Sequence, residues 1–280
     1  MNVRIICDSS ADVSEETREK ITVIPLNLYI GDEEYLDGVN ITYKEFYEKL
    51  IESDELPHTS QANPETFRSV FEDVAKNDET AVLITLSSTL SGTYQSALIA
   101  AEDYEGRIFV VDSKNATIGS GILAELAVRL SEEGLSAKEI SDKLNEEKEK
   151  ICLMGIVDTL EYLKRGGRIS ATAAFAGDML GIKPVLRIKD GEIVILGKAR
   201  GSKKSNNLLV TEIEKTGGVD FSKPVMLGYS GLDDSLLKKY VEDSRFLWEE
   251  HLDGLKEACV GSVIGTHLGP GIVAVAFYNK

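Results

Sequence analysis

Four short polar clusters could bind a ligand, and each comes where a predicted strand ends. They are Asp8-Ser9-Ser10, Thr59-Ser60-Gln61, residues 87–93 and Asp112-Ser113-Lys114. In open parallel sheets, ligands bind outside the carboxyl ends of the strands. These four turns are therefore where we expect a binding site.

The cluster at residues 87–93 is the most informative of the four. Its strand ends at Leu86, and a helix is predicted to begin between Ser91 and Thr93. Small hydroxyl residues and a glycine at a helix start offer hydroxyl and backbone N–H donors to an anion such as a carboxylate or phosphate. Serine and threonine are also ordinary capping residues in this position, so the sequence leaves both interpretations open.

Three glycines and a histidine lie between two apolar runs near the C-terminus, in Gly265-Thr266-His267-Leu268-Gly269-Pro270-Gly271. This density of glycine predicts a tightly constrained loop that approaches a ligand closely. His267 could give an acidic ligand a hydrogen bond or a positive charge. His58 and His251 have no metal-ligand spacing to His267 or to a cysteine, so no metal site is expected.

Two basic segments are further candidates. Arg168 lies between a helix that is predicted to end at Gly166 and another that Ser170 is predicted to cap. For Arg168 a ligand or inter-domain role competes with an ordinary ion pair. A second stretch contains Lys198, Arg200, Lys203 and Lys204. It is either a solvated charge run or a docking surface for an acidic partner or a phosphate-bearing substrate.

The elements that must position these clusters follow an α/β pattern in the first half of the chain. Apolar runs at residues 3–7, 21–30, 81–86 and 108–111 predict strands. Helices are predicted between and after them, starting at Thr42-x-x-Glu45, Asn63-Pro64 and Ser136-x-x-Glu139. Short apolar strands separated by helices indicate a mainly parallel sheet with helices on both faces.

The second half shows a different pattern of predicted elements, which indicates a mixed α+β domain. Asp190-Gly191 between alternating strands indicates a hairpin. Further strands are predicted at residues 225–229 and 272–278, and helices around residues 203–215 and 235–256. A length of 280 residues favours two domains. We place them at residues 1–152 and 153–280.

Composition excludes several classes of function. Residues 1–150 contain 14 Lys and Arg against 31 Asp and Glu, whereas residues 151–280 contain 17 against 16. The acidic first half repels nucleic acid and anionic membrane surfaces.

No apolar run approaches the ~20 residues of a membrane-spanning helix, and the N-terminus lacks the features of a secretory signal. Three scattered cysteines do not suit a disulfide framework. A cytoplasmic location is expected.

Nucleotide and hydrolase motifs are missing or imperfect, so no cofactor is expected. Gly119-Ser120-Gly121-x-x-Ala124 matches a dinucleotide fingerprint only loosely, and neither a P-loop nor a G-x-S-x-G elbow occurs. A Ser91–His267 pair leaves an acyl hydrolase or acyltransferase as an alternative function. A protein-interaction module with an empty pocket is a third hypothesis.

Taken together, the motifs resemble the DegV family of fatty-acid-binding proteins, including the binding subunits of bacterial fatty acid kinase. The matching segments run nearly from end to end. They are Asp8-Ser9-Ser10-Ala11-Asp12, Thr59-Ser60-Gln61, residues 90–97, Asp112-Ser113-Lys114, residues 160–170, Lys198-Ala199-Arg200-Gly201 and residues 264–271. Members often have proline where this chain has Ala62, and glycine where it has Thr89.

The resemblance implies a two-domain α/β fold that holds a long-chain fatty acid between its domains. The family's carboxylate site then maps onto Thr59, Ser60, Ser91, Gly92, Thr93, Arg168, Thr266 and His267. The protein would not be an enzyme itself, because in the family a separate ATP-using kinase subunit phosphorylates the bound acid. Lys198, Arg200, Lys203 and Lys204 would then form the docking surface for this kinase, with Arg200 the foremost candidate.

An acyl tail would need a long apolar channel, and the helix at residues 118–130 is a candidate wall. Ile118 and Ile122 are its predicted tail-lining residues. Ordinary core packing of this helix is the alternative.

Overall fold

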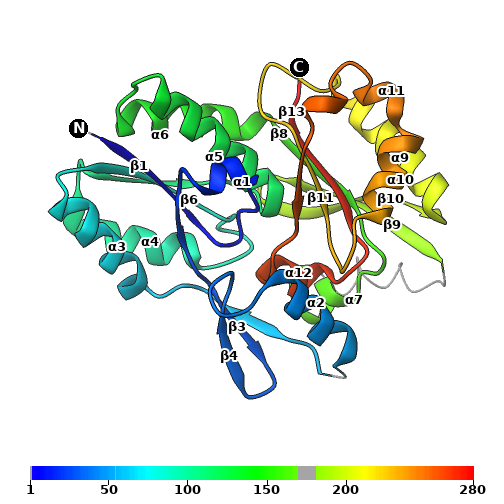
Figure 1. Cartoon of the computed structure of the whole chain (residues 1–280), viewed down its shortest axis with the longest axis horizontal. Coiled ribbons are helices and arrows are strands. Elements are labelled where there is room, and N and C mark those ends of the chain that lie inside the picture. The colour runs from blue at the N-terminus through cyan, green and yellow to red at the C-terminus, as the bar shows by residue number, and fades with distance from the viewer. Residues whose placement is uncertain (1, 54, 170–180) are drawn as a thin grey trace.

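The structure is a computed structural model that describes residues 2–53, 55–169 and 181–280. Ser170, a predicted helix cap, lies outside the described residues. Two main sheets lie side by side, the first on the left of Figure 1 and the second on the right. No described helix is long and apolar enough to cross a membrane.

The first sheet is entirely parallel, in the order β2-β1-β6-β7. On β6, Val82 and Ile84 pack into one hydrophobic cluster while Ala81 and Leu83 pack into another. Both faces of the sheet are therefore buried, which explains the continuous apolar runs and confirms the predicted sheet. The strands are Val3–Asp8 (β1), Thr22–Ile24 (β2), Thr80–Thr85 (β6) and Ile108–Asp112 (β7).

Helices cover both faces of this sheet. α3 (Pro64–Lys76) and α4 (Thr93–Ala101) pack on one face, and α5 (Thr117–Glu132) and α6 (Ala137–Glu147) pack on the other. The predicted capping boxes form at Thr42 and Ser136, and the Asn63 side chain caps α3. The short elements of this half are α1 (Glu15–Arg18), η1 (Glu102–Tyr104) and η2 (Lys148–Lys150).

The second sheet is mixed, in the order β10-β9-β8-β13-β11-β12. Only the β11–β12 pair is parallel among its described strands. The predicted hairpin at Asp190-Gly191 joins β9 to β10. The strands are Ile151–Ile156 (β8), Ile182–Lys189 (β9), Glu192–Arg200 (β10), Met226–Tyr229 (β11), Lys256–Cys259 (β12) and Val273–Tyr278 (β13). The predicted division between residues 152 and 153 falls inside β8 and stays a prediction.

The outer face of the second sheet is covered by α9 (Ser202–Lys215), α10 (Ser235–Asp243) and α11 (Arg245–Trp248). The single helix predicted at residues 235–256 is wrong, because the segment contains two helices, a 3-10 turn (Leu252–Gly254, η3) and the start of β12. At the break, the buried Ser244 hydroxyl donates to the carbonyl of Tyr240 and accepts from the Trp248 indole. This arrangement turns the chain so that Trp248 is buried.

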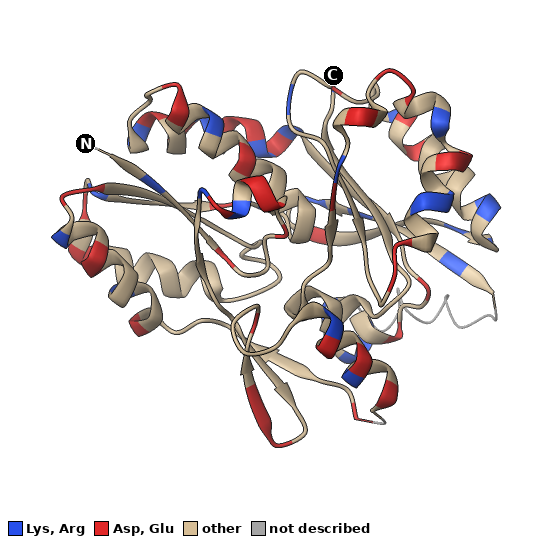
Figure 2. Cartoon of the chain, viewed as in Figure 1, with Lys and Arg blue, Asp and Glu red and all other residues tan. Residues whose placement is uncertain are grey.

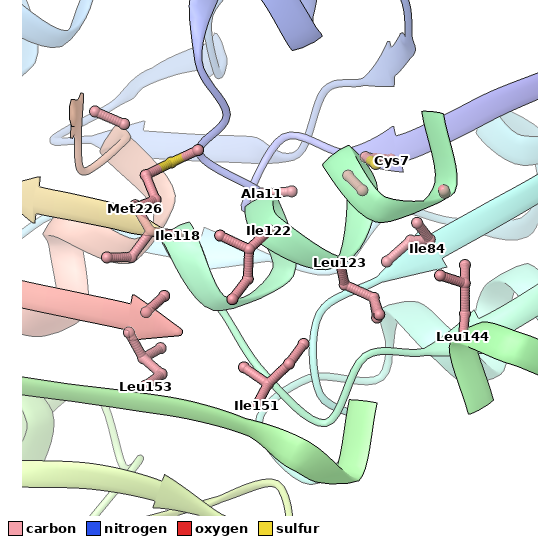
Figure 3. Close-up of a cluster of buried hydrophobic side chains, with 14 of the residues drawn as sticks. Cys7, Ala11, Ile84, Ile118, Ile122, Leu123, Leu144, Ile151, Leu153 and Met226 are labelled. Atoms are coloured by element: carbon pink, nitrogen blue, oxygen red, sulfur yellow. The ribbon is translucent and has the colours of Figure 1, made fainter. Parts of the chain in front are cut away.

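Helix α5 lies between the two sheets and joins their cores. Figure 3 shows Ile118, Ile122 and Leu123 among Ile84 of the first sheet and Leu153 of the second. Ile118 and Ile122 are fully buried in this cluster and do not line the cavity described below. They pack in the core that fixes one sheet against the other, and their tail-lining role stays a prediction.

A third, small sheet of order β4-β3-β5 projects at the bottom of Figure 1. It consists of Asn27–Ile30 (β3), Glu33–Leu36 (β4) and His58–Ser60 (β5), with α2 (Tyr43–Glu52) beside it. The C-terminal helix α12 (Ser262–Leu268) packs against α2, β3, β5 and α7 (Glu161–Arg165). A segment from the end of the chain therefore completes a unit that begins near residue 27.

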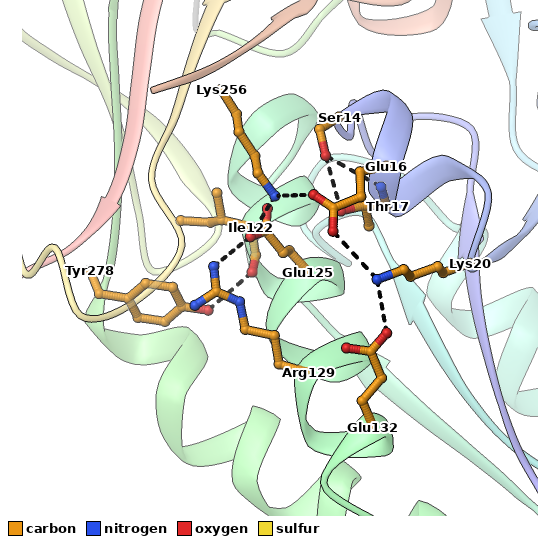
Figure 4. A network of polar contacts seen from close by, with 10 residues as sticks. All are labelled: Ser14, Glu16, Thr17, Lys20, Ile122, Glu125, Arg129, Glu132, Lys256 and Tyr278. Carbon is orange, nitrogen blue, oxygen red and sulfur yellow. Dashed lines mark hydrogen bonds and ion pairs between the residues drawn. The ribbon is translucent and has the colours of Figure 1, made fainter. Parts of the chain in front are cut away.

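A buried carboxylate also ties the two halves together. Lys256 on β12 reaches Glu125 on α5 at 3.0 Å and Glu16 on α1 at 3.3 Å, and Arg129 contacts Glu125 at 2.6 Å (Figure 4). The Glu125 side chain is only 5% exposed, so its contacts with Lys256 and Arg129 are screened less than those of a fully exposed ion pair. This network fixes α5 to the edge of the second sheet.

Candidate functional site

A cavity lies where the ends of the parallel strands face the second sheet. Its walls are mostly apolar and come from the β6–α4 turn, β8, β9, β10, β13, α7 and α12. Its cavity volume is about 110 Å³, and 25 residues line it. Its apolar side chains include Leu86, Leu90, Leu153, Leu163, Leu186, Ile188, Ile193, Val263 and Ile264.

Thr59 and His267 meet in the polar part of the cavity. Pairing of β5 with β3 places Thr59 opposite Leu28, and α12 supplies His267. The Thr59 Oγ1 and His267 Nε2 atoms lie 2.8 Å apart. A Cβ atom on Gly166 would lie 2.3 Å from His267 Nδ1, so this glycine makes room for the ring.

The Ser91 turn supplies the next donor. Ser91 Oγ accepts from the backbone N–H of Thr93 at 3.3 Å and lies 2.9 Å from the Thr93 hydroxyl. A Cβ atom on Gly92 would lie 1.9 Å from Gln61 Oε1. Glycine at position 92 therefore lets Gln61 approach, and Gln61 in turn donates to Ser96 Oγ at 3.2 Å.

Arg168 is the cation nearest the Ser91 turn. Arg187 also lines the cavity, but its Nη2 contacts Cys152 Sγ at 3.5 Å. The Nε atom of Arg168 donates to the carbonyl of Leu90 at 3.3 Å and its Nη1 donates to the carbonyl of Gly166 at 2.5 Å. In residues 2–53, 55–169 and 181–280, no carboxylate pairs with it, and no Asp or Glu lines the cavity. A guanidinium in an apolar cavity without a counter-ion favours an anionic ligand.

His267 is uncharged at neutral pH. Burial, and then the nearby positive charge of Arg168, lower the pKa of its imidazole to about 4. Its Nδ1 is buried and has no hydrogen-bond partner among the described residues. Two roles were predicted for His267: to give the ligand a hydrogen bond or to give it a positive charge. The neutral ring can exchange a hydrogen bond with Thr59 or a ligand. The positive charge beside it belongs to Arg168.

Of the predicted carboxylate residues, Thr59, Ser60, Ser91, Arg168 and His267 line the cavity. Gly92 and Thr93 do not line it and instead support Ser91 and Gln61.

Thr266 lies apart from the cavity, because its buried hydroxyl donates to the carbonyl of Ser262 at 2.8 Å within α12. Gln61 also lines the cavity, although it was not among the predicted carboxylate residues. Its position in the polar cluster Thr59-Ser60-Gln61 could have identified it.

The predicted glycine-rich loop at residues 265–271 is helical over its first part. Gly265, Thr266 and His267 belong to α12, and only the part after Leu268 is a loop. A Cβ atom on Gly265 would lie 2.6 Å from the Tyr47 hydroxyl and 2.8 Å from the Phe46 ring. Gly265 therefore serves close packing between α12 and α2, not backbone freedom.

Among the described residues, no group of three His, Cys, Asp or Glu side chains could hold a metal ion. The three cysteines are free thiols. The cavity lining thus contains hydroxyls, an amide, an imidazole and two arginines, Arg168 and Arg187, among otherwise apolar residues.

Comparison with known proteins decides the family. The family model described as "Uncharacterised protein, DegV family" matches residues 2–280. The chain belongs to the DegV family. A DegV domain-containing protein of Caldanaerobacter subterraneus is 36% identical over 99% of both chains, and one of Clostridium perfringens is 36% identical over 98% of this chain and 96% of that protein.

Solved DegV structures share the whole architecture. A DegV family protein from Thermus thermophilus, described as binding fatty acid, is 30% identical with a TM-score of 0.88 over the full length of both chains. DegV from Bacillus subtilis, described as a fatty acid binding protein, is 30% identical with a TM-score of 0.83 and equal coverage. These matches confirm the predicted two-domain α/β DegV fold.

Replacing His267 by glutamine should remove a pH dependence from stability. The folded-state pKa of about 4 lies below the unfolded value of 6.5, so the folded protein binds fewer protons between these values. The stabilisation from neutral His267 is complete above pH 6.5 and is lost as the pH falls towards 4. Urea unfolding should show the wild type losing roughly 3 kcal/mol more than His267→Gln between pH 7 and 4. Parallel pH profiles for the two proteins would contradict the assignment.

Proposed function

We propose that this DegV protein binds a long-chain fatty acid, with the carboxylate at Arg168, Ser91, Thr59 and His267. The observation that carries the proposal is the Arg168 guanidinium, which has no carboxylate partner among the described residues and lies beside hydroxyl donors in an apolar cavity. The anion would take the place of the missing counter-ion. The relatives described as binding fatty acid support the same ligand class.

The apolar walls would supply most of the affinity. Burial of an acyl chain gives roughly 0.8 kcal/mol per methylene, so a long tail contributes on the order of 10 kcal/mol before ordering costs. The mostly apolar lining suits such a chain, because its methylenes would contact Leu, Ile and Val side chains.

The polar end suits binding better than hydrolysis. A Ser91–His267 hydrolase would need His267 as a base oriented by an acid, yet the pKa of this ring is lowered to about 4 and its Nδ1 has no partner among the described residues. Ser91 is hydrogen-bonded to Thr93 instead. These contacts favour a non-catalytic protein over an acyl hydrolase or acyltransferase.

The binding proposal is tested by comparing palmitate with hexadecanol in equilibrium titrations. The two ligands have the same tail length, and only palmitate carries a charge for Arg168. We expect palmitate to bind at least 10-fold more tightly, since charge-assisted hydrogen bonds contribute about 1.5–3 kcal/mol. Equal affinities would refute the head-group assignment, and failure of both to bind would refute the ligand class.

The proposal extends to a role as the acyl-presenting subunit for a separate, ATP-using fatty acid kinase in the cytoplasm. Its docking surface would be the basic end of β10 and the start of α9, where Lys and Arg gather in Figure 2. Arg200, Lys203 and Lys204 are exposed, and Lys198 is half-buried.

Arg200→Glu should lower acyl-phosphate formation by such a kinase by 10-fold or more while leaving palmitate affinity unchanged, because charge reversal at an interface is costly. Lys215→Glu, at the far end of α9, is the matched control. Unchanged phosphorylation with Arg200→Glu would remove the docking assignment, and a parallel loss of palmitate binding would show that Arg200 acts on the pocket instead.

A further inference from the structure

The β9–β10 hairpin forms one side of the cavity, next to its tip at residues 189–192. Ile188 and Ile193 are directly paired across the hairpin, and both line the cavity. β9 pairs with β8 only from Val185 to Ile188, and β10 is the edge strand of its sheet. The tip therefore extends beyond the part of the sheet that supports it.

Two hydroxyl groups from the first half of the chain hold this tip. Ser87 Oγ donates to the carbonyl oxygen of Gly191 at 2.9 Å, and Thr89 Oγ1 donates to the same oxygen at 2.5 Å. Ser87 is fully buried, so its hydrogen bond is shielded from water, whereas Thr89 is exposed and its hydrogen bond is only partly buried. The contact joins the turn after β6 to the hairpin across a separation of about 100 residues.

The fit at Gly191 is close. Its φ of +85° is unfavourable for residues with a side chain, and a Cβ atom would lie 2.6 Å from Ser87 Oγ and 3.0 Å from Thr89 Oγ1. Glycine is therefore required both by the turn and by the approach of the two hydroxyls.

The two sides of the contact are anchored unequally. In the turn, Ser87 N–H donates to the Asn115 carbonyl at 2.8 Å, and Ser88 Oγ donates to the Asp112 carboxylate at 2.6 Å. The hairpin tip lies beyond its pairing with β8. If the contact breaks, the tip will move and the turn will stay.

We propose that the hairpin tip is a side flap of the cavity, held closed by Ser87 and Thr89, and that opening of this latch sets how fast a bound amphiphile leaves. The inference rests on the proposed binding function. It assigns Ser87 and Thr89 as positioning residues that control exchange of the ligand and do not contact its head group.

The test combines Ser87→Ala with Thr89→Val, which removes both hydroxyls and keeps the side-chain volumes close to the originals. Thr211→Val is the control, since Thr211 makes one hydroxyl hydrogen bond on exposed α9, away from the cavity. We expect the double variant to release radiolabelled palmitate to phosphatidylcholine vesicles roughly fivefold faster or more, consistent with the loss of these hydrogen bonds. Hydrogen exchange at residues 189–194 of the ligand-free protein should also accelerate, with β8 unchanged.

If hydrogen exchange at residues 189–194 were the same in the double variant and the wild type, Ser87 and Thr89 would not hold the tip, whatever ligand the protein binds. Faster exchange with an unchanged palmitate release rate would overturn its control of ligand exit. If the wild type bound no palmitate, the proposed function would fail, and hydrogen exchange would still decide whether the hydroxyls hold the flap. Gly191→Ala, which forces the tip away from Ser87, should reproduce both effects.

Discussion

Replacing Arg168 by alanine is expected to weaken palmitate binding by about 10- to 100-fold, the range for losing a charge-assisted hydrogen bond. Arg168 is the cation beside the polar lining of the cavity, and among the described residues no acidic group competes for it. Hexadecanol, which carries no charge, should lose much less affinity. Titration of both ligands against both proteins measures the difference.

Arg165→Ala is the matched control for this experiment. Arg165 lies three residues earlier, is exposed and pairs with Glu161 on the surface of α7, so its removal should leave palmitate affinity unchanged. An Arg168→Ala variant that binds palmitate like the wild type would contradict the carboxylate site. An equal loss for palmitate and hexadecanol would assign Arg168 a structural role only, through its bonds to Leu90 and Gly166.

Replacing Asp12 by alanine is expected to destabilise the protein by roughly 2–4 kcal/mol, because it leaves two buried donors without a partner. The buried Asp12 carboxylate accepts from the hydroxyl of Thr117 at 2.5 Å and from the backbone N–H of Gly261 at 2.9 Å. Thr117 begins α5, and Gly261 is the residue before α12. Asp12 therefore fixes the start of the helix that carries His267.

Urea unfolding at pH 7 measures this loss, and Asp142→Ala, in an exposed ion pair with Lys138 on α6, is the control with little expected effect. Asp12→Asn should cost less than alanine, since the amide oxygen still accepts a hydrogen bond. A stability of Asp12→Ala equal to that of the control would contradict the anchoring role.

The pH dependence of Asp12 has the opposite sign to that of His267. Burial raises the pKa of this carboxyl to about 8, so the folded protein binds more protons than the unfolded chain above pH 4. The stability that this proton contributes is present at low pH and is lost as the pH rises through 8. The Asp12→Asn variant, which has no titratable group at this position, should therefore not lose this stability as the pH rises through 8.

Local sequence signals sufficed for the parallel sheet and for the helix starts. Continuous apolar runs predicted β1, β6 and β7, because strands buried on both faces are apolar throughout. Thr42 and Ser136 predicted the starts of α2 and α6, because a helix cap depends on residues close in the chain. Three of the four polar clusters fell at the ends of parallel strands, whereas Thr59 and Ser60 lie within β5 of the small antiparallel sheet. Thr59 and Ser91 both line the cavity.

Two glycines of the sequence motifs serve contacts between distant segments. Gly265 was assigned to a tightly constrained loop, but it packs under Tyr47 in a helix. Gly121 resembled part of a dinucleotide motif, whereas a Cβ atom there would lie 1.9 Å from the carbonyl oxygen of Asp12. Nothing local distinguishes a glycine needed for a close approach from one needed for a turn, since the approaching group lies more than 100 residues away.

Ile118 and Ile122 illustrate the same limit. An apolar helix next to a binding turn can line a cavity or fill a core, and its periodicity is the same in both cases. The position of α5 between the two sheets depends in part on strands formed more than 100 residues later, which the periodicity of the helix does not contain. The uncharged state of His267 likewise follows from its burial and its distance to Arg168, which the sequence does not contain.

Native mass spectrometry of the freshly purified protein, followed by lipid extraction, tests the central claim most directly. We predict one adduct per chain whose mass matches a long-chain fatty acid of about 16–18 carbons, a tail whose burial contributes roughly 0.8 kcal/mol per methylene, and recovery of that acid in the extract. A chain with no adduct that also fails to take up added palmitate would contradict fatty acid binding by this protein.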